Sequence, residues 1–182
     1  MDAAWNFINK IWNASRYVIL NLGDMTYPDI DLDGDQTVAD QWILARLHET
    51  IAVVNDHADK FEFSLAGKAL YRFIWDDYCD WYIEMTKEIL DEGSPDQKDM
   101  AKSVLAYVLN AILRLLHPFM PFVTEEIYQH VPHQGDSIVT APYPEADGQF
   151  SNPEAISNMS TLIDLIQAVR SIRALSLIHI SE

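Results

Sequence analysis

The first predicted helix, residues 3–22, carries side chains suited to contacting unpaired bases. Five polar side chains recur there at steps of four, three, four and four: Asn6, Lys10, Asn13, Tyr17 and Asn21. A helix places them on one face. Amides hydrogen-bond base edges, lysine pairs with phosphate, and an aromatic ring offers a stacking surface. The pattern predicts either an RNA-contacting face or an ordinary polar helix face, and the spacing alone does not choose between them.

The same helix has an apolar face opposite these polar residues. Its members are Phe7, Ile8, Ile11, Val18 and Leu22. The segment holds one acid, Asp2, and two bases, Lys10 and Arg16, in an otherwise acidic first half of the chain. We therefore expect the apolar face to pack on a core and the polar face to be available for a partner.

Carboxylates and aromatic rings alternate in residues 75–84. Paired carboxylates can act as general acid and base. On a helix, however, Asp76, Asp80 and Glu84 form one stripe, which we interpret as a solvated acidic face without counter-charge. Cys79 has acidic neighbours and no nearby histidine, so we predict a buried, unreactive thiol. These residues indicate no catalytic site.

An acidic loop offers a second candidate chemistry. Several of its residues match ligand positions of an EF-hand calcium loop: Asp29, Asp31, Asp33, Gly34 and Asp40. The preceding Pro28 and the short Asp at the last position disagree with that motif. The alternative is a solvated loop that caps the next helix through Thr37 or Asp40. His130 and His133 lack further ligands at metal spacing, so we expect no metal site.

Helical periodicity accounts for most of the chain, and the expected fold class is an all-α helical bundle with a small irregular C-terminal attachment. Gly23 and Gly93 are placed to end helices, and residues 94–97 form a capping box. Residues 137–140 are expected to be extended. The expected helices cover residues 3–22, 39–59, 64–90, 95–117, 122–130 and 153–174.

Composition excludes several classes of protein. The chain has 182 residues, 12 basic and 28 acidic side chains and a net charge of −16, which argues against a non-specific nucleic-acid coat. A single cysteine excludes an internal disulfide framework. The apolar stretch at residues 104–123 contains Arg114, so we interpret it as a core helix and expect no membrane partner. Glycine-rich phosphate loops are absent.

Four blocks of sequence resemble the anticodon-binding domain of valine–tRNA ligases. These ligases form a family of class I aminoacyl-tRNA synthetases. The blocks are residues 7–17, 40–44, 73–84 and 113–127, and the resemblance covers about residues 7–174 in matching order. The block around Pro118 and Pro121 is shared with the isoleucine enzymes. The sequences at residues 12–16 and 79–82 favour the valine enzymes over the isoleucine enzymes.

The resemblance implies an all-α bundle of the anticodon-binding type and a role in gripping the anticodon stem-loop of valine tRNA during protein biosynthesis. The His-Ile-Gly-His and Lys-Met-Ser-Lys-Ser signatures, and the editing domain, are absent from this sequence. We therefore expect a catalytically inactive fragment of a ligase. It would have no cofactor of its own, because ATP and Mg²⁺ belong to the parent catalytic domain, its partner in cis. The family further implies a cytoplasmic protein with no DNA partner.

The resemblance also implies roles for individual residues of the opening helix. Lys10 would contact phosphate or a base edge and Tyr17 would stack, while the remaining contacts would come from Asn13, Arg16 and Asn6. We expect residues 1–135 to form the anticodon-binding bundle and residues 136–174 a C-terminal extension ending in a helix. Residues 175–182 depart from the family pattern and are expected to be a non-native tail.

Two other functions stay open on the sequence. The chain could be a stand-alone acidic helical module that binds a basic protein, or a calcium-binding helical domain. The charge distribution favours RNA, because residues 23–40 hold six acids and no base whereas residues 1–22 are nearly neutral. Acidic surfaces elsewhere would discourage indiscriminate phosphate binding and leave one face for RNA.

Overall fold

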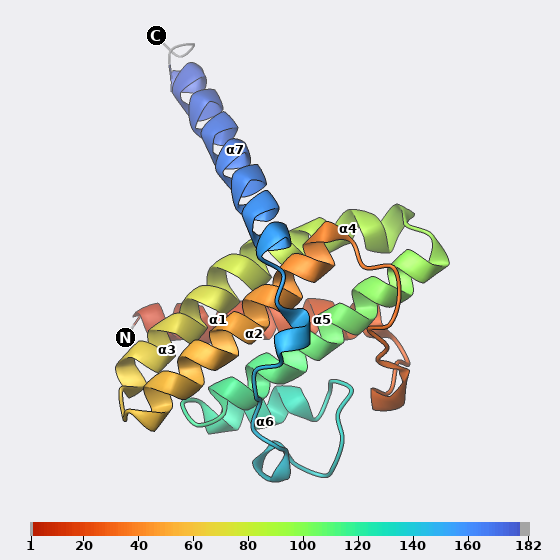
Figure 1. The fold of residues 1–182 in the computed structure, drawn as a ribbon, viewed down its shortest axis with the longest axis vertical. Helices are drawn as coiled ribbons and strands as arrows, with labels where there is room; N and C mark the ends of the chain where they lie inside the picture. The colour runs from red at the N-terminus through yellow and green to blue at the C-terminus, as the bar shows by residue number, and fades with distance from the viewer. Residues whose placement is uncertain (1, 179–182) are drawn as a thin grey trace.

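The computed structural model describes residues 2–178, with side-chain surroundings for residues 4–174, and those residues form an all-α bundle without strands (Figure 1). The expected fold class is confirmed. The α-helices are α1 (Asp2–Leu22), α2 (Val38–Asp59), α3 (Phe63–Arg72), α4 (Ile83–Glu92), α5 (Pro95–Leu116), α6 (Pro121–Tyr128) and α7 (Pro153–Ile178). A π-helical segment, η2 (Phe73–Tyr82), joins α3 to α4. No helix within the described range is long and apolar enough to span a bilayer.

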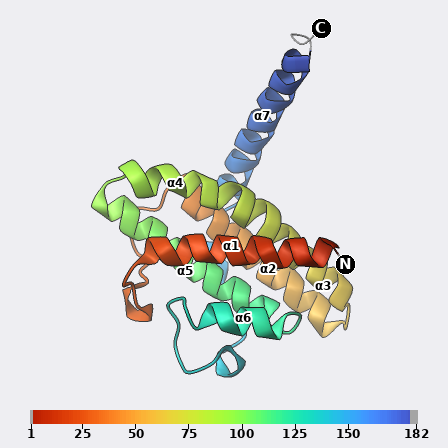
Figure 2. The same cartoon turned by 180° about the vertical axis from the view of Figure 1, so that it is seen from behind.

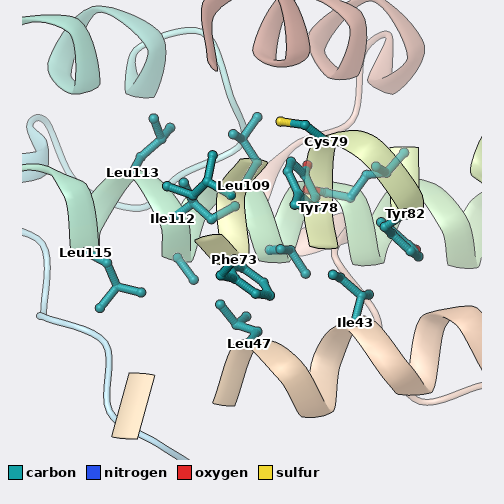
Figure 3. Close-up of a cluster of buried hydrophobic side chains, with 14 of the residues drawn as sticks. Ile43, Leu47, Phe73, Tyr78, Cys79, Tyr82, Leu109, Ile112, Leu113 and Leu115 are labelled. Atoms are coloured by element: carbon teal, nitrogen blue, oxygen red, sulfur yellow. The ribbon is translucent and has the colours of Figure 1, made fainter. Parts of the chain in front are cut away.

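Helix α5 forms the centre of the bundle. The predicted capping box starts it: the Ser94 hydroxyl accepts from the Gln97 amide, and the Gln97 side chain accepts from the Ser94 amide. Apolar side chains then bury most of the helix surface against α1, α2, α4 and α6. Figure 3 shows part of this core, in which Leu109 and Ile112 of α5 lie near Phe73 and Tyr78. The predicted core helix at residues 104–123 is thus confirmed up to Leu116.

The segment from α3 through η2 to α4 is one continuous helical rod, as the periodicity predicts, but its middle is wider than an α-helix. The Ile83 amide, for example, donates to the carbonyl of Tyr78, five residues earlier. The wider turn places Tyr78 and Tyr82 on the buried side. Their hydroxyls are satisfied there: Tyr78 donates to the Leu105 carbonyl and Tyr82 to an Asp40 carboxylate oxygen. The rod is therefore tied to both α5 and α2.

Asp40 joins this network to the start of α2. Thr37 is the N-cap, and its hydroxyl accepts from the Asp40 amide at 3.2 Å, while Asp40 Oδ2 accepts from the Thr37 amide at 2.8 Å. The other carboxylate oxygen accepts from Tyr82 at 2.6 Å. The predicted capping role of these two residues is confirmed, and Asp40 is buried.

The connection between α6 and α7 runs back over α2 as a strap, residues 129–152 (Figure 1). The Asn55 side chain donates to the Pro144 carbonyl at 3.1 Å, and Asn152 donates to the Gln41 side chain at 3.1 Å. The prediction of an extended piece at residues 137–140 is wrong. Ile138–Thr140 form a 3₁₀ turn, because the Ser137 hydroxyl accepts from the Val139 amide and closes the turn locally.

Helix α7 begins against α2 and then leaves the bundle (Figure 1). Ala155 and Met159 are buried, whereas most later side chains up to residue 174 are exposed. The Arg170 guanidinium lies 5.3 Å from the ring centre of Trp81. The helix continues through Ile178. Of the predicted non-native tail, residues 179–182 lie outside the described residues.

Candidate RNA interface

Helix α1 lies across one face of the bundle, with α6 beside it (Figure 2). Most of the predicted apolar face is confirmed: Phe7, Ile11, Val18 and Leu22 are buried, whereas Ile8 is half-buried. The helix ends at Gly23, whose φ of 59° lies in the left-handed region that favours glycine. Burial of these apolar side chains fixes the rotation of α1 about its axis. That rotation in turn sets where the polar side chains of α1 lie.

Lys10 lies on the flank of α1 that faces η2. Its ammonium pairs with the Asp80 carboxylate and lies 3.8 Å from the ring centre of Trp75. The side chain is 22% exposed. A charge in this position is already neutralised, so a phosphate group could recruit Lys10 only by competing with Asp80.

Tyr17 lies on the same flank, two turns further along. The Lys87 ammonium is 5.7 Å from its ring centre, and the ring is partly buried. Partial burial raises the pKa of the Tyr17 hydroxyl, and the nearby Lys87 charge opposes that shift. One face of the ring is therefore covered by a lysine, which leaves the remainder for a stacking partner.

Asn6, Asn13 and Arg16 lie on the solvent-exposed part of α1. All three are exposed, and within residues 4–174 none of their side chains has a hydrogen-bond or ion-pair partner. Two amides and a guanidinium are thus available on the outer surface of α1. Arg16 could bind phosphate or stack on a base, and the amides could read base edges.

The prediction that the polar residues at steps of three and four share one face of α1 is only partly right. Lys10 and Tyr17 lie on the η2 side of α1, while Asn6, Asn13 and Arg16 face solvent. The difference arises because a stripe at steps of three and four spans a wide arc of the helix. The π-helical segment η2 then packs against one edge of that arc.

The interpretation of Asp76, Asp80 and Glu84 as a stripe without counter-charge is wrong. Asp80 pairs with Lys10, and Glu84 accepts from Lys87 at 2.6 Å. The sequence could not show the first pair, since its members are 70 residues apart. Asp77, on the neighbouring flank, pairs with Arg46 of α2 at 3.1 Å. Asp80 and Asp77 therefore link η2 to α1 and α2, whereas the pair of Glu84 and Lys87 lies within α4.

Sequence reasoning missed the aromatic residues on the outer surface of α1. Trp5 is 64% exposed and Trp12 is 46% exposed, and Leu20 is also exposed. The seven-residue spacing of the two tryptophans is two helical turns, which was the available signal. Exposed indole rings beside Asn13 and Arg16 add stacking surfaces to the candidate interface.

Other candidate chemistries lose support from the geometry. Both carboxylate oxygens of Asp40, the last residue of the calcium-loop motif, are engaged by Tyr82 and Thr37. Among the described residues, no group of three or more His, Cys, Asp or Glu side chains could hold a metal ion. Cys79 is buried as predicted, and burial raises the pKa of its thiol to about 12. That thiol is unreactive at neutral pH.

Comparison with known proteins places these features in a family. Residues 40–181 match the family described as the anticodon-binding domain of tRNA ligase, which is more than half of the chain. The chain belongs to the anticodon-binding domain family of tRNA ligases. The helices of the bundle from α2 onward, with the strap, are therefore parts of such a domain.

The relatives extend the match to α1. The chain is 56% identical to the valine–tRNA ligase of Geobacillus kaustophilus and 58% identical to that of Enterococcus faecalis, over 174 residues in each case. These alignments cover 96% of this chain, so they include most of α1, and the resemblance to valine–tRNA ligase is confirmed. The chain spans about one fifth (20%) of the length of these relatives.

A solved structure supports the fold of this anticodon-binding domain. The bundle resembles part of LeuRS from Agrobacterium radiobacter K84, crystallised as a ternary complex with tRNA and LeuAMS, with a TM-score of 0.59. The match covers 82% of this chain and 17% of LeuRS at 19% identity. At that identity the likeness shows a shared fold alone.

Proposed function

We propose that the chain recognises the anticodon stem-loop of valine tRNA as part of a valine–tRNA ligase. The observation that carries the proposal is the outer surface of α1 in a member of this family. That surface presents Asn6, Asn13 and Arg16 without partners among the described residues, beside exposed tryptophans. Amide, guanidinium and indole groups are those that bind single-stranded RNA loops.

Lys10 and Tyr17 would join the interface in a different way. Each is held at the edge of α1 by a neighbour, Asp80 for Lys10 and Lys87 for Tyr17. RNA phosphate would compete with Asp80 for Lys10, and a loop base would cover the open part of the Tyr17 ring. Direct contacts to RNA, with no protein partner to displace, would come from Asn13, Arg16 and Asn6.

Attachment of valine to tRNA with ATP and Mg²⁺ would belong to the other parts of the ligase, in the cytoplasm where translation occurs. This chain would position the tRNA and would not aminoacylate it alone.

Binding of a labelled stem-loop, measured by fluorescence anisotropy, tests the proposal. The wild-type chain should bind the valine anticodon stem-loop more tightly than the same stem-loop with its anticodon replaced. Arg16→Ala should weaken binding to both RNAs by about tenfold, because it removes a charge-assisted phosphate contact. Asn13→Ala should reduce mainly the preference between them, because base-edge contacts carry sequence information.

Matched variants control for charge and for general effects of substitution. Lys60→Ala removes an exposed base from the C-terminal end of α2, and Asn158→Ala removes an exposed amide from α7. Neither should change RNA affinity measurably. Equal affinity of the wild-type chain for the two stem-loops would contradict specific anticodon recognition.

A further inference from the structure

A small cleft opens between α1 and α6, which lie side by side in Figure 2. Its volume is about 250 Å³, and its lining is mainly apolar. Trp12, Ser15 and Arg16 line it from α1, Glu126 and Ile127 line it from α6, and His130 lines it from the start of the strap. Of the predicted site residues, Arg16 lines this cleft.

The floor of the cleft holds an unsatisfied hydroxyl. Ser15 is 1% exposed, and among the described residues its Oγ has no hydrogen-bond partner. Buried polar groups in folded proteins are nearly always paired, so a ligand that enters this cleft could supply the partner that the hydroxyl lacks among the described residues. A ligand of this cleft therefore needs a hydrogen-bonding group that reaches Ser15 between the apolar side chains.

The side of the cleft formed by α6 and the start of the strap presents hydrogen-bond acceptors. His130 Nδ1 lies 2.8 Å from the Glu126 carbonyl, and because a carbonyl only accepts, the proton must be on Nδ1. In the neutral ring Nε2 is then an acceptor. The Glu126 carboxylate is exposed and adds further acceptor oxygens. A ligand that presents N–H donors would complement this side of the cleft.

The α1 side of the cleft supplies a stacking surface and a positive charge. The Trp12 indole is 46% exposed, and the Arg16 guanidinium is exposed beside it without an ion-pair partner in the described part of the chain. An aromatic ring and a guanidinium plane are the surfaces on which unstacked RNA bases rest, and Arg16 can also meet the attached phosphate. A planar, donor-bearing, phosphate-linked ligand therefore fits.

We propose that this cleft binds one extruded RNA base that carries an exocyclic amino group, so adenine, cytosine or guanine in preference to uracil. The base stacks on Trp12, its amino group donates to Glu126 or His130, and the Ser15 hydroxyl gains a partner. The proposal rests on the proposed recognition of a tRNA stem-loop and assigns one subsite within it.

Variants of the cleft test the proposal with the stem-loop of valine tRNA. Trp12→Ala should weaken binding by about five- to a hundredfold, the usual range for loss of one stacked base. Phe61→Ala is the matched control, because Phe61 is 81% exposed between α2 and α3, outside both α1 and the cleft, and it should leave affinity within about twofold of wild type. Thermal melting checks that each variant is folded.

Ser15→Ala separates binding from a structural role. If the hydroxyl serves a ligand, its removal should weaken RNA binding by about three- to tenfold and leave the melting temperature equal or higher, since a buried unpaired group is lost. A serine that serves only the fold would give a lower melting temperature and unchanged affinity. That result would overturn the proposal.

Single loop nucleotides replaced by abasic residues identify the occupant. One abasic position should weaken binding to the wild-type chain and have no further effect in Trp12→Ala, because both changes remove the same stack. At that position uridine should bind less tightly than the native base, and Glu126→Gln should reduce this difference. If the wild-type chain binds no stem-loop, the proposed function fails; if it binds and no position couples to Trp12, the cleft proposal alone fails.

Discussion

At the scale of single residues, Lys10 is a candidate RNA-binding side chain that already has partners within the protein. Its ammonium is paired with Asp80 and lies over the Trp75 ring. Partly exposed ion pairs contribute about 0.2–1 kcal/mol, so exchange of Asp80 for an RNA phosphate costs little. The pair therefore orients Lys10 along α1 without removing it from a possible interface.

Releasing Lys10 should strengthen RNA binding. We expect Asp80→Asn to tighten binding of the valine anticodon stem-loop by roughly two- to fivefold, since it frees Lys10 and removes a carboxylate near the RNA. Anisotropy titrations at one salt concentration measure the change. Asp76→Asn is the control, because it removes one exposed charge from the same segment and leaves the Lys10 pair intact. Equal effects of the two variants would show that Lys10 takes no part.

At the scale of secondary-structure elements, the strap is held to α2 by a buried histidine. The Asp147 amide donates to His48 Nδ1 at 3.0 Å, so in the neutral ring Nε2–H donates to the Tyr107 hydroxyl at 3.1 Å. The ring also stacks on Phe150 with centres 4.4 Å apart. Protonation of Nδ1 would break the bond to the strap.

The His48 contact predicts a loss of stability in mild acid. Burial lowers the pKa of His48, while the Asp147 charge opposes that shift, so the unfolded chain takes up this proton at a higher pH than the folded chain. The free energy of unfolding should therefore fall as pH drops below about 6.5, by at most about 1.4 kcal/mol per pH unit from this group. Urea unfolding at about pH 7.5 and about pH 5.5 measures the effect.

A variant without a titrating ring isolates this contribution. His48→Gln should be less stable than wild type at neutral pH but should lose less stability on acidification. His57→Gln is the matched control, because His57 pairs with Glu62 at the surface and holds no strap. A pH dependence that His48→Gln leaves unchanged would assign the loss to other groups.

At the scale of the whole molecule, the charge of −16 limits how the chain can bind RNA. Several bases are already paired with carboxylates: Lys10, Arg46, Lys60 and Lys87. Arg16 is exposed on the proposed interface without such a partner among the described residues. Affinity must then come mainly from stacking and hydrogen bonding to loop bases, with few phosphate contacts.

The dependence of affinity on salt tests this view. With Arg16 and a released Lys10 as the phosphate contacts, the logarithm of the binding constant should fall against the logarithm of salt with a slope of about −1 to −2. Titrations between roughly 50 and 200 mM salt give the slope. Arg16→Ala should make it shallower by about one contact. A slope steeper than about −4 would require a basic surface that this bundle lacks in its described part.

Local patterns determined the helices, their caps and the apolar face of α1, because each depends on residues three to seven apart. The Ser94–Gln97 box, the stop at Gly23 and the burial of Ile11 and Val18 follow from such spacing. Family membership also followed from sequence blocks, and the comparisons confirm it.

Only the tertiary structure decided which polar residues of α1 are available. Lys10 meets Asp80 across 70 residues of sequence, and the α1–α6 cleft joins Ser15 to His130, so no local pattern contains either arrangement. The wider π-helical turn of η2 sets where Trp75 and Asp80 lie, and helical periodicity alone assumes a regular turn. The sequence thus determined that this surface is polar and helical, whereas packing between distant elements decided which side chains are paired and which remain for RNA.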